Sequence, residues 1–217
     1  MAGIDYKLAR KAMVDGQIAV SSVVDRRLLA AFLDIPRERF LPEDRRAMAY
    51  SDVPHPLGNG RVLPPAVQFA RIAQLAAIGP QDRVLDVGSG SGYSAAILAR
   101  LAVAVVAYEG DKELVTIAQH TLGDLDITNV SVVTDIREAQ AAGPYDVILL
   151  EQAILEPPET YLSCLALGGR LVAVVGLGRA GVATLWTRTA EGVVSRPHFN
   201  ASLPTHLPDD RREEFVF

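Results

Sequence analysis

The chain has 217 residues, of which 49% are hydrophobic and 22% charged, a composition ordinary for a globular protein with a full core. Its formal net charge is −5, and no stripe of Lys and Arg interleaved with aromatic residues marks a nucleic-acid partner. Charged residues interrupt the apolar stretches well short of a membrane span, and the first residues lack a signal-peptide core. We therefore expect no nucleic-acid partner and no attachment to a membrane.

Cysteine and histidine usage excludes two further classes of protein. Cys164 is the single cysteine, which rules out an internal disulfide framework and fits a reducing cytosol, so a cytoplasmic location is expected. The histidines are scattered without the spacing of metal ligands: His55, His120, His198 and His206. We expect no metal site.

The first eighty residues predict helices and a loop. Apolar residues recur at helical spacing over residues 8–18 and 26–35, and Asp25 is placed to cap the second helix. Residues 49–66 are rich in Pro and Gly and predict an irregular loop. Helical spacing resumes over residues 66–79, in a segment expected to pack on a sheet.

From Arg83 onward, short β-branched runs alternate with helical stretches. The predicted strands cover residues 84–88, 103–109, 130–135, 146–151 and 170–176. The helices between them include residues 93–101 and 112–122, the latter with Gly123 as its C-cap. The strands are apolar nearly throughout, which is typical of parallel strands covered on both faces. Residues 182–199 then predict an antiparallel hairpin at the edge of the sheet.

This order predicts a doubly wound, mostly parallel, Rossmann-like α/β sheet with a helical N-terminal cap. We expect one domain over residues 1–217, with a cap at 1–80 and an α/β core at 81–217. Cys164 and Trp186 are expected to pack in this core. For the C-terminal tail, a mobile segment and a strand docked on the sheet edge remain open.

A glycine turn follows the first predicted strand of the core. Gly88, Gly90 and Gly92 stand at alternate positions in DVGSGSG, where glycine allows positive φ and lets a ligand approach backbone N–H groups. This spacing differs from the G-x-G-x-x-G fingerprint of dinucleotide enzymes. Asp86, just before the turn, would repel a pyrophosphate but suits the cationic methionine end of S-adenosylmethionine. The pattern favours this cofactor over NAD.

Two further acids stand at the ends of predicted strands. Glu109 is placed to accept hydrogen bonds from both ribose hydroxyls of a nucleotide. Both cofactors carry a ribose, so this role does not distinguish them. The alternative for Glu109 is a solvated carboxylate at the end of a strand. Asp135 is placed to accept from an adenine amino group, or is an ordinary strand-end acid. Two positions remain open for Tyr93: the wall of the cofactor pocket, or the core. The predicted cofactor-binding residues are Asp86, Gly88, Ser89, Gly90, Gly92, Tyr93, Glu109, Gly110, Asp135 and Ile136.

Six segments together resemble the protein-L-isoaspartate O-methyltransferases, a family of class I S-adenosylmethionine enzymes. They are MVDGQI, IPRERFLPE, AYSDVPHPLGNGR, DRVLDVGSGSGYSAAILARL, PYDVILLEQA and LGGRLVAVVG, and they span nearly the whole chain. The resemblance implies a seven-stranded sheet with an altered order of its last strands. It also implies methyl transfer from S-adenosylmethionine to isoaspartyl carboxylates of proteins or peptides, which is protein repair.

The chain departs from the family in one segment. The resemblance implies a Thr-x-Ser pair after P-L-x-x-G-x-G, and these positions hold Val62 and Pro64 here. Neither side chain can donate a hydrogen bond that would orient a substrate carboxylate. Backbone N–H groups must then replace the hydroxyls, or the chain methylates another acceptor.

Few residues are candidates for acid–base chemistry, and a carboxylate acceptor needs none because it is ionised at neutral pH, with a pKa of about 4. His55 stands in the loop expected to cover the methyl donor and is otherwise an exposed loop histidine. Glu151 follows the fourth core strand, facing the site or capping the next helix. The predicted catalytic positions are Val62, Pro64, His55 and Glu151.

Three functions remain open at this point. The first is methylation of isoaspartyl carboxylates, which the resemblance implies. The second is methylation of a small-molecule acceptor, suggested by Val62 and Pro64. The third is a catalytically silent protein that binds S-adenosylmethionine. We expect a monomer or a weak dimer.

Overall fold

A computed structural model describes residues 4–155, 159–176 and 178–205 of the chain. His206 and the C-terminal tail, for which two arrangements were left open, lie outside the described residues. Every predicted strand and helix of the core falls within these ranges.

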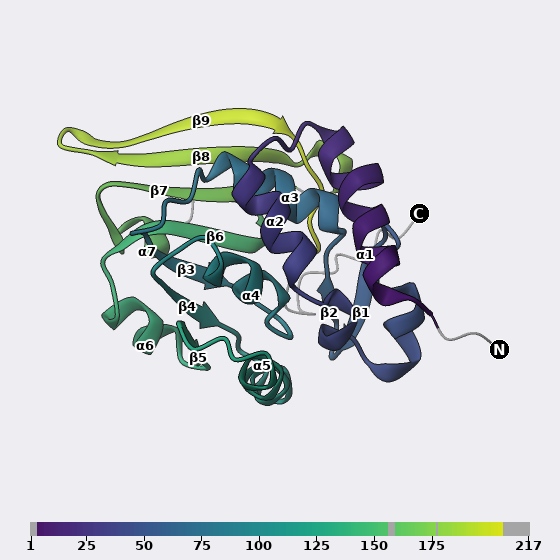
Figure 1. The fold of residues 1–217 in the computed structure, drawn as a ribbon. Coiled ribbons are helices and arrows are strands. Elements are labelled where there is room, and N and C mark those ends of the chain that lie inside the picture. The colour runs from purple at the N-terminus through teal and green to yellow at the C-terminus, as the bar shows by residue number, and fades with distance from the viewer. Residues whose placement is uncertain (1–3, 156–158, 177, 206–217) are drawn as a thin grey trace, which may run out of the picture.

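A seven-stranded sheet forms the centre of the protein, in the order β5-β4-β3-β6-β7-β8-β9. Its first five members in that order run parallel, and β8 and β9 add antiparallel strands at one edge, as predicted (Figure 1). The last three strands stand in chain order. The bounds are β3 Arg83–Val87, β4 Ala104–Tyr108, β5 Val130–Val133, β6 Tyr145–Ile154, β7 Leu165–Val175, β8 Val182–Thr189 and β9 Gly192–Asn200.

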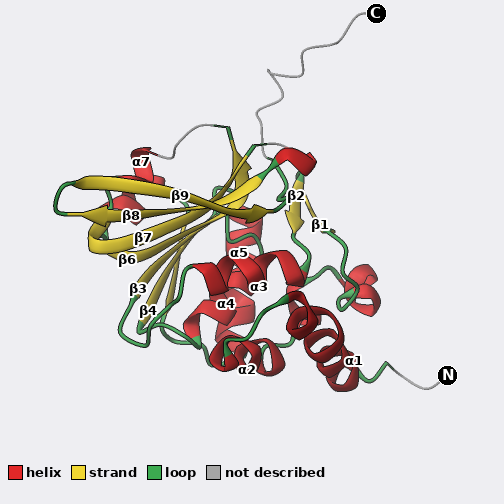
Figure 2. Cartoon of the chain, turned by 90° about the horizontal axis from the view of Figure 1, so that it is seen from above, coloured by secondary structure: helices red, strands yellow, loops and turns green. Residues whose placement is uncertain are grey.

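Helices cover the two faces of the sheet because successive strand residues point to opposite sides. In β3, Val84 joins a cluster that includes residues of α1 to α5, whereas Leu85 joins a second cluster under α6 and α7. Figure 2 shows α2, α3 and α4 together below the sheet and α7 on the other side. The bounds are α1 Tyr6–Met13, α2 Arg26–Asp34, α3 Ala66–Leu75, α4 Tyr93–Ala99, α5 Lys112–Asp124, α6 Ile136–Ala141 and α7 Glu159–Leu162.

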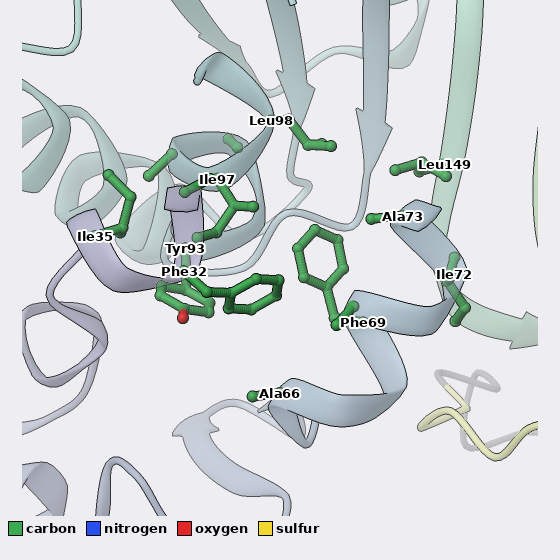
Figure 3. Close-up of a cluster of buried hydrophobic side chains, with 14 of the residues drawn as sticks. Phe32, Ile35, Ala66, Phe69, Ile72, Ala73, Tyr93, Ile97, Leu98 and Leu149 are labelled. Atoms are coloured by element: carbon green, nitrogen blue, oxygen red, sulfur yellow. The ribbon is translucent and has the colours of Figure 1, made fainter. Parts of the chain in front are cut away.

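The N-terminal helices share the core of the sheet. Phe32 of α2 and Phe69 of α3 pack edge to face near Ile97 and Leu149 (Figure 3). Asp25 caps α2 as expected, accepting from the backbone N–H groups of the first turn. One continuous apolar cluster therefore joins residues of the predicted cap to the predicted core, while the division of the chain at residue 80 stays a prediction.

Two local predictions were wrong, and a third was borne out with different helix geometry. Residues 49–66 are not wholly irregular, because β1 (His55–Gly58) and β2 (Arg61–Leu63) form a hairpin whose turn residues Gly58, Asn59 and Gly60 all have positive φ. The helix predicted over residues 8–18 is present: it begins at Tyr6 and becomes a π-helix over Val14–Ile18, followed by a 3₁₀ turn. Gly123 lies inside α5, and the C-cap is Leu125, whose backbone N–H bonds back to the last turn.

Smaller elements complete the chain. Short 3₁₀ helices cover Arg37–Phe40, Glu43–Met48 and Gly178–Ala180. Trp186 is buried in the second cluster, and Cys164 packs against it partly buried, as expected for both.

Candidate functional site

The order of the strands reverses between β3 and β6, which lie side by side at the centre of the sheet. In open α/β sheets, ligands bind in the crevice at the carboxyl ends of the strands at such a point. Asp86 lies near that end of β3, and Glu151 lies two positions beyond Leu149, the residue paired with Asp86. The topology therefore brings together two acids that are 65 positions apart in the sequence.

The glycine turn is fastened to the neighbouring strand through its backbone. The N–H groups of Gly88 and Ser89 donate to the carbonyl oxygen of Tyr108, at 2.8 and 3.2 Å. Gly88 has φ +83°, and a Cβ there would lie 3.3 Å from Gln152 and 3.5 Å from Arg61. The face of Gly88 that lacks a side chain is thus turned toward polar groups rather than toward the core.

The other two glycines of the motif meet different surroundings. A Cβ on Gly90 would lie 3.0 Å from Leu57 of β1, so the hairpin covers this glycine. A Cβ on Gly92 would lie 3.0 Å from Ala118, which means that Gly92 permits the close approach of α5 to the start of α4. A side chain on Gly88 would therefore face a polar site, one on Gly90 the hairpin, and one on Gly92 the helix α5.

Glu109 is not a solvated strand-end acid, because its side chain is 2% exposed. One oxygen accepts from the backbone N–H of Gly90 at 2.8 Å, and the other from that of Asp111 at 3.0 Å. Its first oxygen also forms an ion pair with Arg61 of β2. The turn after β3, the turn after β4 and the hairpin are all fixed by this one carboxylate.

A cavity of about 530 Å³ opens beside Glu109. Of the predicted cofactor residues, Gly88, Glu109 and Gly110 line it directly. The remaining lining residues come from the hairpin, from the ends of β3 and β4, from the start of α5, from β6 and from α7: Asn59, Arg61, Val87, Tyr108, Asp111, Gln152 and Tyr161.

A second, much smaller cavity of about 20 Å³ adjoins the first. The predicted catalytic positions Val62 and Glu151 both line it, together with Gly90 and residues 204–205. Arg61, Gly88 and Gln152 line both cavities and form the partition between them.

Asp86 and Glu151 form a buried acidic pair at the inner end of the site. Asp86 is fully buried, and one of its oxygens accepts from the Ser94 hydroxyl at 2.7 Å. Its other oxygen, Oδ1, has no hydrogen-bond partner within the described residues. Burial raises the pKa of Asp86 to about 7, with a further increase from the negative charge of Glu109. Burial and the charge of Asp86 raise the pKa of Glu151 well above its ordinary value.

One residue predicted to bind the cofactor, Tyr93, packs in the core. Tyr93 packs edge to face against Phe32 and Phe40, with ring centroids 6.3 and 5.5 Å away, and lines neither cavity (Figure 3). The guanidinium of Arg37 lies 4.7 Å above its ring. Tyr93 thus packs in the core, which was one of its two alternatives, and its assignment to cofactor binding stays a prediction.

His55 and Pro64 flank the hairpin on its buried side. His55 is 3% exposed, so the alternative of an exposed loop histidine was wrong, and burial together with the charge of Arg37 lowers its pKa. The carbonyl oxygen of Pro64 accepts from Arg37 Nη2 at 2.7 Å. Neither residue lines the two cavities, whereas Val62 between them does.

Asp135 and Ile136 lie at the start of α6, away from the residues that line the two cavities. The Asp135 side chain is 58% exposed and caps this helix, accepting from the Arg137 N–H at 2.8 Å. Ile136 packs against the second apolar cluster. The assignment of both residues to an adenine pocket stays a prediction.

Sequence reasoning missed several polar residues of the site. Asn59 and Arg61 were passed over because their segment was interpreted as an irregular loop, although the G-N-G turn is itself a hairpin signal. Asp111 directly follows the Glu109–Gly110 strand end, and Gln152 directly follows Glu151, so proximity in sequence could have included both. Tyr161 comes from α7, and no sequence pattern connects it to the site.

The described residues contain neither a metal cluster nor a membrane-spanning helix. Within residues 4–155, 159–176 and 178–205, no three His, Cys, Asp or Glu side chains gather as a metal site would require. In the same ranges, no helix combines the length and the apolar character needed to cross a membrane.

Comparison with known proteins identifies the family. The chain matches the family "Protein-L-isoaspartate(D-aspartate) O-methyltransferase (PCMT)" over residues 8–202. The chain belongs to this family. It is 37% identical to the protein-L-isoaspartate O-methyltransferase of Geobacter metallireducens over 175 residues, covering 80% of this chain and 81% of that protein. It is 40% identical to that of Methanoregula boonei over 173 residues, covering 79% of each.

Solved structures agree with this fold. A protein-L-isoaspartate O-methyltransferase structure superposes with a TM-score of 0.79 at 25% identity, over 92% of this chain and 66% of that one. A Plasmodium falciparum structure in complex with S-adenosyl-L-homocysteine has a TM-score of 0.76 at 20% identity, over 94% of this chain and 98% of that one. The seven-stranded α/β fold predicted from the sequence is confirmed.

The protein-L-isoaspartate O-methyltransferase family uses S-adenosylmethionine, and the residues of this chain fit that cofactor. Gly88 leaves a face that a Cβ would fill, and Asp86 Oδ1 is a buried acceptor without a partner. Glu109 adds a buried carboxylate beside a cavity of about 530 Å³, within the range of ligand pockets. The glycine spacing and the flanking acids predicted S-adenosylmethionine rather than NAD. Membership of the family confirms this cofactor.

Proposed function

We propose that this protein transfers the methyl group of S-adenosylmethionine to the free carboxylate of isoaspartyl residues in proteins and peptides. The observation that carries the proposal is the family match over residues 8–202, which includes both the glycine turn and the hairpin that covers it. The curated relatives from Geobacter and Methanoregula bear the name of this activity.

Each of two buried acids is assigned to a different part of the cofactor. We assign the ribose hydroxyls to Glu109, because a buried carboxylate there can accept from both. Asp86 Oδ1 accepts from the ammonium group of the methionine end, which would give this oxygen its missing partner. The backbone of Gly88 lies against the ligand between the two acids.

Methyl transfer to a carboxylate demands little acid–base chemistry from the protein. S-adenosylmethionine supplies a methyl group on a positively charged sulfur, and the acceptor carboxylate is already ionised, with a pKa of about 4. Glu151 lines the small cavity, and burial together with the charge of Asp86 raises its pKa well above the ordinary value, which favours the neutral form and weakens repulsion of an incoming carboxylate. The remaining contribution is to orient the acceptor and exclude water.

His55 has no part in this reaction as we propose it. Its side chain is buried away from both cavities, and its lowered pKa keeps it neutral. No base is required for a carboxylate acceptor, which agrees with this placement. The cytoplasmic location and the monomeric or weakly dimeric state, both expected from the sequence, remain part of the proposal.

The test uses cofactor labelled on the methyl group with an isoaspartyl peptide and its normal aspartyl twin. We expect label in the isoaspartyl peptide alone, as a methyl ester that alkali releases. The variant Gly90→Val provides the background, because it removes the cofactor site. Label in neither peptide, with S-adenosylhomocysteine still bound by the protein, would contradict the proposed acceptor and favour a small molecule in its place.

A further inference from the structure

Arg61 stands between the two cavities and belongs to neither the glycine turn nor the acidic pair. It is the first residue of β2, and its side chain is 11% exposed. Its guanidinium pairs with Glu109 on one side. On the other side lies the amide of Gln152, which accepts from the guanidinium when its oxygen is turned toward it.

This arrangement closes the inner end of the site, where the methionine end of the cofactor is expected, and leaves the larger cavity beside Glu109 open. Nη2 of Arg61 lies 3.5 Å from the position that a Cβ on Gly88 would take, so the guanidinium covers the open face of the glycine. The cavity beyond it, at Val62 and Glu151, has a volume of about 20 Å³. That is room for about one water molecule and not for the methionine end of a ligand.

The same contact occupies the carboxylate that the ribose requires. Glu109 Oε2 already receives the N–H of Gly90 and the guanidinium of Arg61, while Oε1 receives the N–H of Asp111. The two N–H groups belong to the rigid turns after β3 and β4. The Arg61 side chain is the partner that rotation about its own bonds can remove, so it is the one that ribose hydroxyls displace.

A displaced Arg61 has a limited choice of positions. Its Cα stays in the hairpin, one residue from Val62 and next to Gly60, and both of these residues line the small cavity. Glu151 is the acid that lines this cavity, and burial with the charge of Asp86 raises its pKa, which favours its neutral form; Asp86 and Glu109 are assigned to the cofactor. A guanidinium without an anionic partner at this point binds a carboxylate well, because its planar fork matches the two oxygens.

We propose that Arg61 is the acceptor-binding residue, released from Glu109 when the cofactor binds and then holding the carboxylate that receives the methyl group. This inference rests on the proposed function and deepens it. It makes binding ordered, because the acceptor meets a free guanidinium only after the cofactor has entered. It also places a charged donor next to Val62, whose side chain lacks a hydroxyl that could orient the carboxylate.

The experiment measures the two ligands separately in Arg61→Gln. Calorimetry with S-adenosylhomocysteine should show a Kd a few-fold lower than that of the unmodified protein, because no ion pair has to be broken. The KM for the isoaspartyl peptide should rise about ten- to a hundredfold, the effect of one lost hydrogen bond to a charged group, with kcat nearly unchanged. A merely structural role for Arg61 would weaken the binding of both ligands.

Two further variants serve as controls for this experiment. Arg61→Lys keeps the charge without the planar fork, so its KM should lie between those of the other two proteins, and it decides the question if Arg61→Gln does not fold. Arg137→Gln changes an exposed arginine on α6 and should alter neither constant. A cofactor Kd that stays the same or rises in Arg61→Gln, or an unchanged acceptor KM, overturns the proposal.

A failure of the proposed function can be distinguished from a failure of the proposal for Arg61. If the unmodified protein methylates no isoaspartyl peptide, glutarate serves as the carboxylate probe, followed by NMR on protein saturated with S-adenosylhomocysteine. Glutarate binding that is lost in Arg61→Gln supports the role of Arg61 for another carboxylate acceptor. Glutarate binding that is absent, or equal in the two proteins, overturns it.

Discussion

The two sides of the site are built in different ways. The glycine turn is held by backbone hydrogen bonds to β4 and by the buried carboxylate of Glu109. The β1–β2 hairpin opposite is held to that turn and to the start of α5 by side chains: Leu57 against Gly90, Asn59 donating to Asp111 at 2.9 Å, and Arg61 paired with Glu109.

This difference determines how each side responds to a ligand. Backbone bonds within a buried sheet open only with much of the fold, whereas a contact between side chains opens when one of them rotates about its own bonds. A ligand that binds Glu109 competes with a hairpin contact and leaves the glycine turn in place. The glycine side should therefore be a preformed cofactor site, and the hairpin side an adjustable acceptor site.

The largest effect is expected from Gly90→Val, which attacks the preformed side. The φ of +55° is strained for a branched residue, and the new Cβ would lie 3.0 Å from Leu57. We expect no detectable binding of S-adenosylhomocysteine by calorimetry. Gly123→Ala is the control, since a Cβ there meets nothing within 4 Å inside α5, and it should retain full binding. Retained binding by Gly90→Val would show that the turn is adjustable too.

Glu109→Ala removes the carboxylate that both sides share. Cofactor binding should weaken by about 1–3 kcal/mol, because buried hydrogen-bonding groups are left without a partner. The Kd for S-adenosylhomocysteine from calorimetry measures this loss. Glu138→Ala, an exposed acid on α6, is the matched control. An unchanged Kd would mean that Glu109 only fastens the hairpin.

Val62→Thr tests the adjustable side. The unmodified protein should turn over isoaspartyl peptides slowly, and a hydroxyl at this cavity-lining position should raise the rate roughly tenfold, the value of one added hydrogen bond to a charged group. Pro64→Ser alone should change little, because residue 64 lines neither cavity. We expect the double variant Val62→Thr, Pro64→Ser to match Val62→Thr. Rapid methylation by the unmodified protein would contradict the need for a hydroxyl.

The smallest effect is expected in the number of protons that Asp86 releases when the cofactor binds. Because the pKa of Asp86 is raised to about 7, binding of the cationic methionine end should release up to one proton near neutral pH. Affinity should then fall as the pH drops below about 7, by at most tenfold per pH unit. Calorimetry of S-adenosylhomocysteine in two buffers of different ionisation enthalpy counts the protons, and Asp86→Asn should release none from this residue.

The same carboxyl group affects the stability of the ligand-free protein. A pKa raised above its unfolded value of about 4 means that the folded state binds the extra proton. The contribution of Asp86 to the free energy of unfolding is therefore full below pH 4 and is lost as the pH rises toward 7. Thermal unfolding from pH 4 to 7 should show a weaker decline in Asp86→Asn. An equal decline in both proteins would contradict the raised pKa.

Local patterns carried the sequence predictions that succeeded. The apolar runs after Arg83, the N-cap at Asp25 and the edge hairpin at residues 182–199 all follow from residues close together in the chain. The glycine spacing with Asp86 indicated the right cofactor for the same reason, since a strand end and the turn after it are one continuous segment. Family membership was visible in the order of such segments.

The placements that the sequence left open required knowledge of distant neighbours. Tyr93 directly follows the glycine turn, yet its ring packs on Phe32 and Phe40 because α4 turns that face toward the N-terminal helices. His55 stands between two prolines, yet the contact of β1 with the core buries it. The side of an element that is buried depends on its partners, and a short segment with two prolines has no periodicity to reveal them.

By itself, then, the sequence determined the sheet, the glycine turn and the cofactor, because periodicity and turn chemistry act over a few residues. Only the tertiary structure decided that Arg61 meets Glu109 across 48 positions, and that Val62 rather than Pro64 lines the cavity. A long cationic side chain on a loop has many rotamers of similar energy. Which carboxylate it selects is decided by the acids that other strands bring within its reach.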